Sequence, residues 1–178
     1  MYFDLTKIGI FFDSIVVVGL VTGFLLNLLF FLLKIKDNLS LIVTSGIVAL
    51  SYLGSNVFLD LTQADHTLYL LWFFYDLLTI ILLIGINYKL KVPWCTALHY
   101  VFLFLAINSL LYLGLYIDLG VFETREQWWF WSVYSVAVLV CDCAIVITLI
   151  IDKDWLGLKK LMARINRLGM PDYANESK

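Results

Sequence analysis

The sequence has little charge and almost no proline. Only 15% of its 178 residues are charged and 62% are hydrophobic, whereas soluble domains have about 25% charged and about 45–50% apolar residues. This is not the composition of a water-surrounded globule, so the apolar excess must face lipid. Of the two prolines, Pro93 only begins an apolar segment and the other lies near the C-terminal end. No long apolar segment therefore contains this helix breaker.

The sequence also lacks the motifs of the common enzyme classes. It contains no H-E-x-x-H zinc-protease motif, no G-x-S-x-G nucleophile elbow, no P-loop and no dinucleotide-binding fingerprint. The three cysteines and two histidines are too scattered for a disulfide framework, a zinc site or a bis-histidine haem. We therefore expect no enzymatic activity, no metal and no cofactor. Basic residues gather only in the last segment, so nucleic-acid binding is not expected either.

What the sequence does contain is five long apolar segments. A helix needs about 20 residues to cross a hydrocarbon core of about 30 Å, and each segment has that length. The predicted spans are residues 8–33, 39–59, 68–88, 94–117 and 128–151. The sequence therefore predicts an all-α integral membrane protein, with a five-helix transmembrane domain over residues 1–152.

Lysine and arginine predict the orientation of these spans. Lys34, Lys36, Lys89 and Lys91 lie in loops at one set of ends, together with the basic segment that follows the fifth span, whereas the opposite ends are mostly acidic. Loops rich in lysine and arginine stay in the cytoplasm. We therefore expect the N-terminus outside, the C-terminus in the cytoplasm, and a multi-pass protein of the inner (plasma) membrane.

Two acids within the spans, Asp76 and Asp142, are the most unusual feature. A carboxylate in the bilayer is costly and marks a candidate functional site, and no Lys or Arg lies in the core of any span to pair with it. Three states of each acid remain open: protonated and hydrogen-bonded, facing a wet cavity, or bound to a cation. The acids differ in predicted depth by about five residues, or about 7–8 Å, so a catalytic acid pair would need helix shifts.

The helical period connects these acids to other polar side chains. Asn108 is predicted at the depth of Asp76, and we expect its carboxamide and a tyrosine hydroxyl to satisfy that acid. The complete predicted buried polar seam is Asp76, Asn87, Asn108, Tyr112, Ser135 and Asp142.

Small residues at helical spacing predict close packing between helices. Gly19 and Gly23 form a small-x-x-x-small pair, which lets two helix backbones approach. Their partner is either another span of the same chain or a second copy, and both alternatives remain open. The second span carries a stripe of hydroxyl side chains and glycine. The predicted helix-packing positions are Gly19, Gly23, Asn27, Ser51, Gly54 and Ser55.

After residue 152 the sequence becomes basic and amphipathic. A helix is predicted over residues 153–170, followed by a polar tail over 171–178. A basic amphipathic helix at a membrane exit lies on anionic lipid or docks into the groove of a partner, and both alternatives remain open. Its apolar face holds Trp155, Leu158, Leu161, Met162 and Ile165, and its basic face holds Lys160, Arg164 and Arg167.

These features favour a function through interaction. We expect an oligomeric, non-enzymatic sensor, anchor or effector subunit that works with membrane lipid and a cytoplasmic partner, in a defence, immunity or stress system. The alternative is a homo-oligomeric ion channel or proton-linked transporter that uses Asp76 and Asp142. Unbroken spans without an internal repeat disfavour many transporter folds but not an oligomeric pore. A third hypothesis is a bundle that binds lipid or an apolar small molecule.

Overall fold

The computed structural model describes residues 5–58, 66–124, 126, 128–161 and 164, with side chains from residue 12 onward. The elements are α1 (Leu5–Leu32), α2 (Leu39–Phe58), α3 (Thr67–Leu90), α4 (Thr96–Tyr116), η2 (Ile117–Val121) and α5 (Trp129–Ile151). The element η2 is a short π-helix that continues α4. With η2 counted as the end of α4, five helices are long and apolar enough to cross a membrane. This confirms the predicted all-α architecture.

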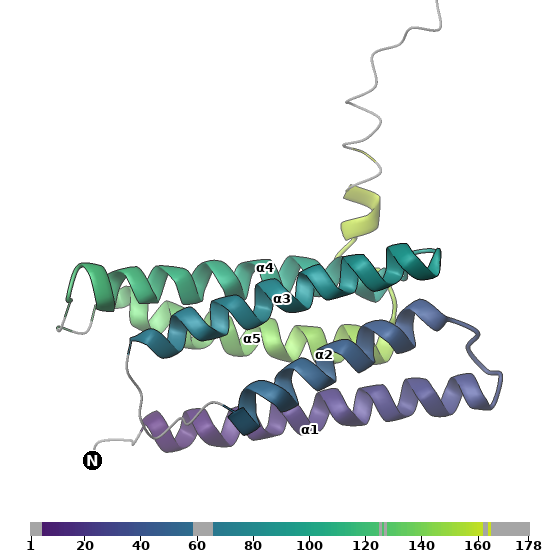
Figure 1. Cartoon of the computed structure of the whole chain (residues 1–178), viewed down its shortest axis with the longest axis horizontal. Coiled ribbons are helices and arrows are strands. Elements are labelled where there is room, and N and C mark those ends of the chain that lie inside the picture. Colours follow the sequence, from purple (N-terminus) through teal and green to yellow (C-terminus); the bar gives the residue numbers. More distant parts are fainter. Residues whose placement is uncertain (1–4, 59–65, 125, 127, 162–163, 165–178) are drawn as a thin grey trace, which may run out of the picture.

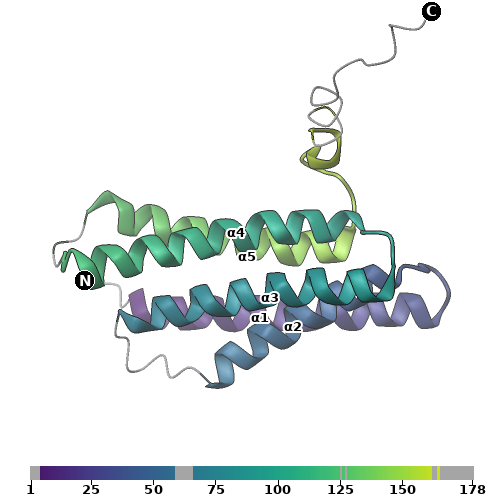
Figure 2. The same cartoon turned by 45° about the horizontal axis from the view of Figure 1, so that its top comes forward.

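The helices close into a ring in chain order. Each of α1 to α4 packs against the next helix along the chain, and α5 returns to pack on α1; α2 also contacts α4 and α5. Figures 1 and 2 show the elongated bundle, and Figure 2 shows that α2 diverges from it toward the C-terminal end of that helix. We call the end with the α1–α2 and α3–α4 loops the basic end, because it holds Lys34, Lys36, Lys89, Lys91, Lys153, Lys159 and Lys160. The opposite, acidic end holds Asp118, Glu123 and Glu126.

The fourth span is longer than predicted, and the helix predicted over residues 153–170 begins later in the chain. The sequence predicts that the fourth span ends at residue 117, but η2 carries it to Val121; the other described ends lie within about three residues of those predicted. Beyond α5, residues 158–161 and 164 are helical, whereas residues 152–157 are not. Gly157 has φ +71°, a conformation that interrupts a right-handed helix. Met162, Ile165, Arg167 and the tail 171–178 lie outside the described residues.

The surface is more apolar than that of a soluble protein. Large apolar side chains such as Leu50, Val57 and Leu110 are about 70% exposed, as is expected of helices that face lipid. Several polar side chains, by contrast, are buried. The buried polar residues are Asn27, Ser40, Thr44, Ser45, Asp76, Thr79, Asn87, Asn108, Ser109, Asp118, Asp142 and Thr148.

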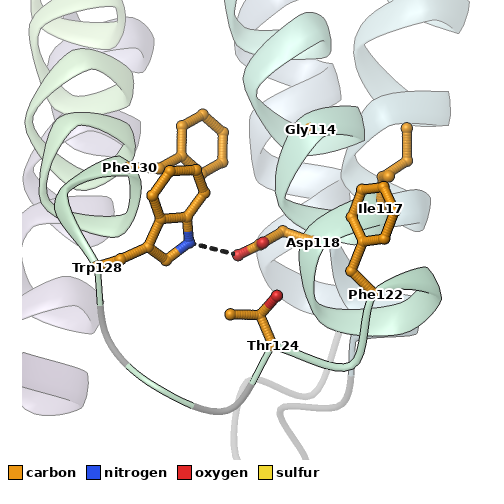
Figure 3. Close-up of a pocket in the computed structure, with 7 residues that line it drawn as sticks. All are labelled: Gly114, Ile117, Asp118, Phe122, Thr124, Trp128 and Phe130. Atoms are coloured by element: carbon orange, nitrogen blue, oxygen red, sulfur yellow. Dashed lines mark hydrogen bonds between the residues drawn. The ribbon is translucent and has the colours of Figure 1, made fainter.

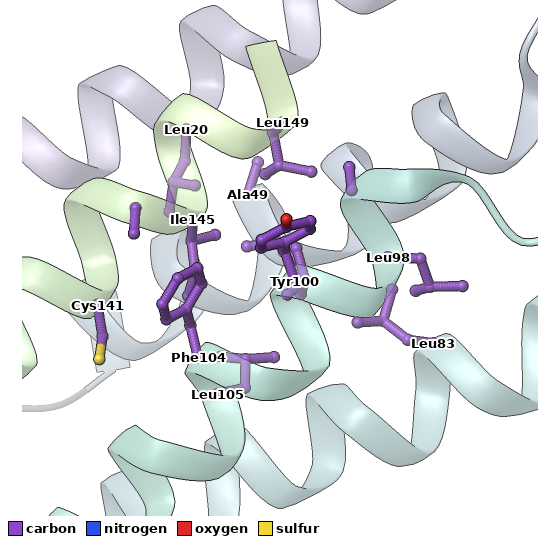
Figure 4. Close-up of a cluster of buried hydrophobic side chains, with 14 of the residues drawn as sticks. Leu20, Ala49, Leu83, Leu98, Tyr100, Phe104, Leu105, Cys141, Ile145 and Leu149 are labelled. Carbon is purple, nitrogen blue, oxygen red and sulfur yellow. The ribbon is translucent and has the colours of Figure 1, made fainter. Parts of the chain in front are cut away.

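The apolar core is centred on α4. This helix contributes Leu98, Tyr100, Val101 and Leu105, all fully buried. Together with Leu20, Leu83, Ile145 and Leu149 from three other helices they form one cluster. Figure 4 shows this cluster around Leu98, Tyr100 and Leu105. For a helix in a membrane, the lipid is as apolar as a neighbouring helix. Close side-chain packing, rather than exclusion of water, therefore holds the helices together. Because α4 lies in the middle of this core, it connects the two ends of the bundle.

Glycines in α1 form close contacts within the chain. A Cβ on Gly19 would lie 3.1 Å from Val146 Cγ1, and one on Gly23 would lie 3.5 Å from Ile150 Cγ1. Both partners belong to α5, so within one copy this glycine pair serves intramolecular packing. Gly54 is different, since among the described residues a Cβ at this position would meet nothing within 4 Å. The part of the chain that the structure describes therefore shows no packing partner for Gly54.

Candidate functional site

Asp142 connects three helices inside the bundle. Its Oδ1 accepts a hydrogen bond of 2.6 Å from the Tyr52 hydroxyl of α2 and one of 2.7 Å from Asn108 Nδ2 of α4. Asp142 and Asn108 are both buried. Two donors directed at one oxygen stabilise a carboxylate in a medium of low dielectric. The expected Asn108 carboxamide therefore does bind an acid, but the acid is Asp142 and not Asp76, and the tyrosine hydroxyl comes from Tyr52 of α2 instead of the fourth span.

Asp76 lies beside this group without equivalent donors. It is buried, and within the described part of the chain its Oδ2 has no hydrogen-bond partner, nor does Asn108 Oδ1. Its carboxyl is nevertheless close enough to that of Asp142 for the two to interact electrostatically. A depth difference of about 7–8 Å is compatible with this interaction, because charges act over such distances in a dry core. We call Asp76, Asp142, Asn108 and Tyr52 the core acid cluster.

Four aromatic rings lie between the core acid cluster and the acidic end. Tyr69 and Trp72 of α3, Tyr112 of α4 and Tyr134 of α5 form a closed cycle, with neighbouring ring centroids 5.3–6.0 Å apart. Trp72 lies one helical turn before Asp76, and Tyr112 lies one helical turn after Asn108. Tyr112, a predicted seam residue, lies near Asp142. These rings, which belong to three helices, thus cover the cluster on the side of the acidic end.

Two other residues of the predicted seam lie elsewhere. Ser135 is exposed, and its hydroxyl donates to Trp131 O of its own helix, so its prediction as a buried polar residue is wrong. It shares a helix face with Asp142, but the described part of the chain leaves that face exposed at the level of Ser135. Asn87 is buried but belongs to the basic end, where its Oδ1 accepts 2.8 Å from Ser40 Oγ. The seam is therefore two separate polar groups.

The hydroxyl stripe of α2 and Asn27 of α1 form direct contacts between helices. The Ser51 and Thr79 hydroxyls are 2.5 Å apart and join α2 to α3. Asn27 Nδ2 donates 2.9 Å to Leu149 O and joins α1 to α5. These two predicted packing positions are supported by contacts. Ser55 is satisfied within α2 itself, because its hydroxyl donates to Tyr52 O.

Asp152 joins three helix ends at the basic end. Its backbone is left-handed, with φ 48°, and terminates α5. Its Oδ1 accepts 2.9 Å from the Ala97 N–H at the start of α4, and its Oδ2 accepts 3.2 Å from Asn38 Nδ2 before α2. A carboxylate at a helix N-terminus satisfies an unpaired N–H and complements the helix dipole. Asp152 therefore serves as a cap supplied from another helix.

Tyr100 attaches the chain after α5 to the core. Its fully buried side chain donates 2.6 Å to Asp154 Oδ1, and its hydroxyl oxygen accepts from the N–H groups of Leu156 (2.9 Å) and Leu158 (3.3 Å). Its ring also stacks on Trp155, with centroids 6.0 Å apart. We call Tyr100, Asp154, Trp155, Leu156 and Leu158 the Tyr100 latch. It holds the start of the basic segment in one position.

The hydrogen bond from Tyr100 also sets the charge of the latch. It holds the pKa of Asp154 below its usual value, with further support from the Lys159 N–H. A depressed pKa in the folded state contributes stability above the ordinary aspartate pKa of about 3.9, and this contribution is lost as the pH falls through the lowered pKa. The latch therefore keeps its carboxylate at neutral pH.

A third polar group closes the acidic end. Asp118 Oδ2 accepts from the indole N–H groups of Trp128 (3.0 Å) and Trp131 (2.7 Å), so η2 is tied to the start of α5. Beside it lies an open pocket of about 370 Å³, shown in Figure 3. Its lining is Gly114, Ile117, Asp118, Phe122, Thr124, Trp128 and Phe130. The carboxylate already has its donors, which favours a structural role for Asp118.

Sequence reasoning missed several of these residues. Tyr52 follows Thr44 and Val48 at intervals of four residues, so the helical period alone could have placed it on the buried face of α2. Tyr100 carried no such signal, because its partners lie beyond a helix end and their position depends on the fold. The same holds for Asp152, whose bonds reach α4 and the start of α2.

Comparison with protein-family models, with curated proteins and with solved structures finds no match for this chain.

Proposed function

We propose that this chain is a non-enzymatic, oligomeric subunit of the inner (plasma) membrane, a sensor, anchor or effector. It acts through contact of its basic C-terminal segment with a cytoplasmic protein. The observation that carries the proposal is the Tyr100 latch: a fully buried core side chain fixes the start of that segment by three hydrogen bonds. A segment that only rests on lipid needs no such attachment, whereas preorganisation favours docking of a partner.

The exposed side chains in the latch and just after it suit a partner groove. Leu156 and Leu161 are 58% and 55% exposed, while Leu158 packs against the core. Lys160 and Arg164 are exposed beside them. An apolar pair flanked by basic side chains fits a groove with an apolar floor and an acidic rim.

The connection of the latch to the core acid cluster supports a sensor more than a passive anchor. Asn108 and Tyr100 belong to the same helix, eight residues or about 12 Å apart at 1.5 Å per residue. Asp142 and Asp152 are likewise joined by the second half of α5. A displacement of α4 or α5 at the cluster would therefore move the latch, since a helix transmits such a shift as a rigid element.

The geometry gives less support to a homo-oligomeric channel lined by Asp76 and Asp142. Both acids are inside the bundle of one copy, and a pore between copies is lined by outward faces. If copies do assemble, α2 offers an open surface, because a Cβ at Gly54 would meet none of the described residues within 4 Å. The glycine pair of α1 is already covered by α5.

The proposed orientation places the basic end in the cytoplasm. A cysteine at Thr124, which lies at the acidic end, should react with a membrane-impermeant thiol reagent in intact cells, and a reporter after Lys178 should be cytoplasmic. Lysines retained on the inner side are the physical reason. The native thiols need a control, so the unmodified chain is labelled in parallel. Reaction of Thr124→Cys only after permeabilisation would reverse the orientation and with it the proposed side of the partner.

The partner contact is tested by photo-crosslinking in cells from residue 161. We expect a crosslink to a cytoplasmic protein, and we expect Leu156→Ser to reduce it strongly, because this change removes the other exposed apolar side chain and leaves the charges and the backbone hydrogen bond of residue 156 in place. The measurement is the yield of the crosslinked product, with insertion of the chain checked in the membrane fraction.

Two controls separate a protein partner from lipid. Lys160→Gln with Arg164→Gln should weaken binding to anionic vesicles, since each charge contributes about 1 kcal/mol near such a surface, while the crosslink is reduced less. A crosslinker at Glu123, at the opposite end, should give no cytoplasmic product. Crosslinks to lipid alone from residue 161 would leave the segment a membrane anchor and refute the proposed function.

A further inference from the structure

The core acid cluster has more acceptors than the surrounding protein satisfies. Asp76 is 7% exposed and Asn108 is fully buried, yet Asp76 Oδ2 and Asn108 Oδ1 have no partner in the described residues. The Asn108 amide is fixed by its Nδ2, which donates to Asp142, so its free oxygen stays in the same cluster. Buried polar atoms are normally paired, and these two unfilled acceptors require a donor or a positive charge.

Among the described residues, no fixed positive charge faces the cluster. The ionisable groups around it are acidic or neutral: Asp13 from α1, Tyr112 from α4 and Tyr134 from α5. The cluster itself contributes Tyr52 from α2, Asp76 from α3, Asn108 from α4 and Asp142 from α5. Two neighbouring carboxylates without a counter-ion are strongly unfavourable in a low-dielectric interior. The cluster must therefore take up a cation.

We propose that Asp76 and Asp142 form a proton-binding site, in which Asp76 carries the proton and Asp142 remains a carboxylate. Asp142 has the two donors that stabilise a charge, whereas Asp76 has an unpartnered oxygen. Two acids that share a site hold one proton between them. A proton on Asp76 turns an unfilled acceptor into a donor, and Asn108 Oδ1 is an acceptor available in the same cluster.

The site goes beyond the proposed partner contact and does not depend on it. It needs no second protein, and it would stand if the basic segment were only a lipid anchor. It does give the bundle a group whose occupancy changes the charge at the point where α2, α3, α4 and α5 meet. An alkali-metal cation could neutralise the same oxygens, so the test must separate the two cations.

Infrared difference spectroscopy of the full chain in lipid nanodiscs tests the proposal. We expect the carbonyl absorption of a protonated carboxylic acid near neutral pH, lost in Asp76→Asn and kept in Glu123→Gln, which neutralises an exposed acid. Asp76→Glu should keep a protonated-acid band at a shifted frequency. Exchange of sodium for choline should leave the band unchanged.

Several results would overturn the site. They are the absence of any protonated-acid band near neutral pH, a band that survives Asp76→Asn but disappears in Asp142→Asn, and a band that appears only when sodium is removed. The first would show that no proton is bound, the second that Asp142 carries it, and the third that an alkali cation occupies the site. If Asp76→Asn does not fold, the wild-type and Asp76→Glu spectra still decide between these outcomes.

Discussion

Asp142→Leu is expected to lower the free energy of unfolding by about 2–6 kcal/mol, because it leaves the Tyr52 hydroxyl and the Asn108 amide as two buried donors without an acceptor. Each buried donor without an acceptor costs about 1–3 kcal/mol. In the wild type both donors bind the same Asp142 oxygen. The measurement is reversible unfolding in mixed micelles, followed by helix content. A variant as stable as the wild type would show that the cluster does not hold the bundle together.

Two further variants identify the cause of that loss. Asp142→Asn keeps an acceptor oxygen at nearly the same volume, so we expect it to fold with a much smaller loss. Adding Tyr52→Phe to Asp142→Leu should recover part of the stability, since removal of both partners is far less costly than removal of one. Ser135→Ala is the matched control on the same helix, expected within about 0.5 kcal/mol because its side chain is exposed. No recovery in the double variant would point to lost volume instead of an unpaired donor.

Tyr100→Phe is expected to release the chain after α5 while the bundle stays folded. The ring and its stacking on Trp155 remain, but Asp154 loses its donor and the N–H groups of Leu156 and Leu158 lose their acceptor. A loss of about 1–3 kcal/mol in this contact corresponds to about a 5- to 150-fold rise in local opening. Amide hydrogen exchange over residues 154–161 measures it, and the crosslink from residue 161 should fall in parallel.

Tyr112→Phe provides the control for a lost tyrosine hydroxyl. Tyr112 belongs to the same helix and packs in the aromatic cycle, but it contacts no part of the latch. Its exchange over residues 154–161 should equal that of the wild type. If Tyr100→Phe leaves this segment equally protected, the position of the segment is set by other contacts and the Tyr100 latch is not the link to the partner.

Much of the site could have been anticipated, but not the partners within it. Asp76, Asn108 and Asp142 are recognisable because polar side chains are costly in an apolar helix, and all three are indeed buried. Helical period shows which side chains share a face, but it does not show which neighbour covers that face. For this reason the sequence alone pairs Asn108 with Asp76 instead of Asp142, and places Ser135 in the interior.

Local sequence was sufficient for the number and length of the helices. Their apolar composition excludes water as a partner for the backbone, so each long apolar segment must satisfy its own N–H and C=O groups as a helix. The tertiary structure alone decided the contacts that matter for function: the two donors on Asp142, the cap that Asp152 supplies to α4, and the attachment of Asp154 to Tyr100. Each of these bonds joins residues 34 to 90 positions apart, and such pairs depend on how the helices are rotated and displaced against each other, which no single helix specifies.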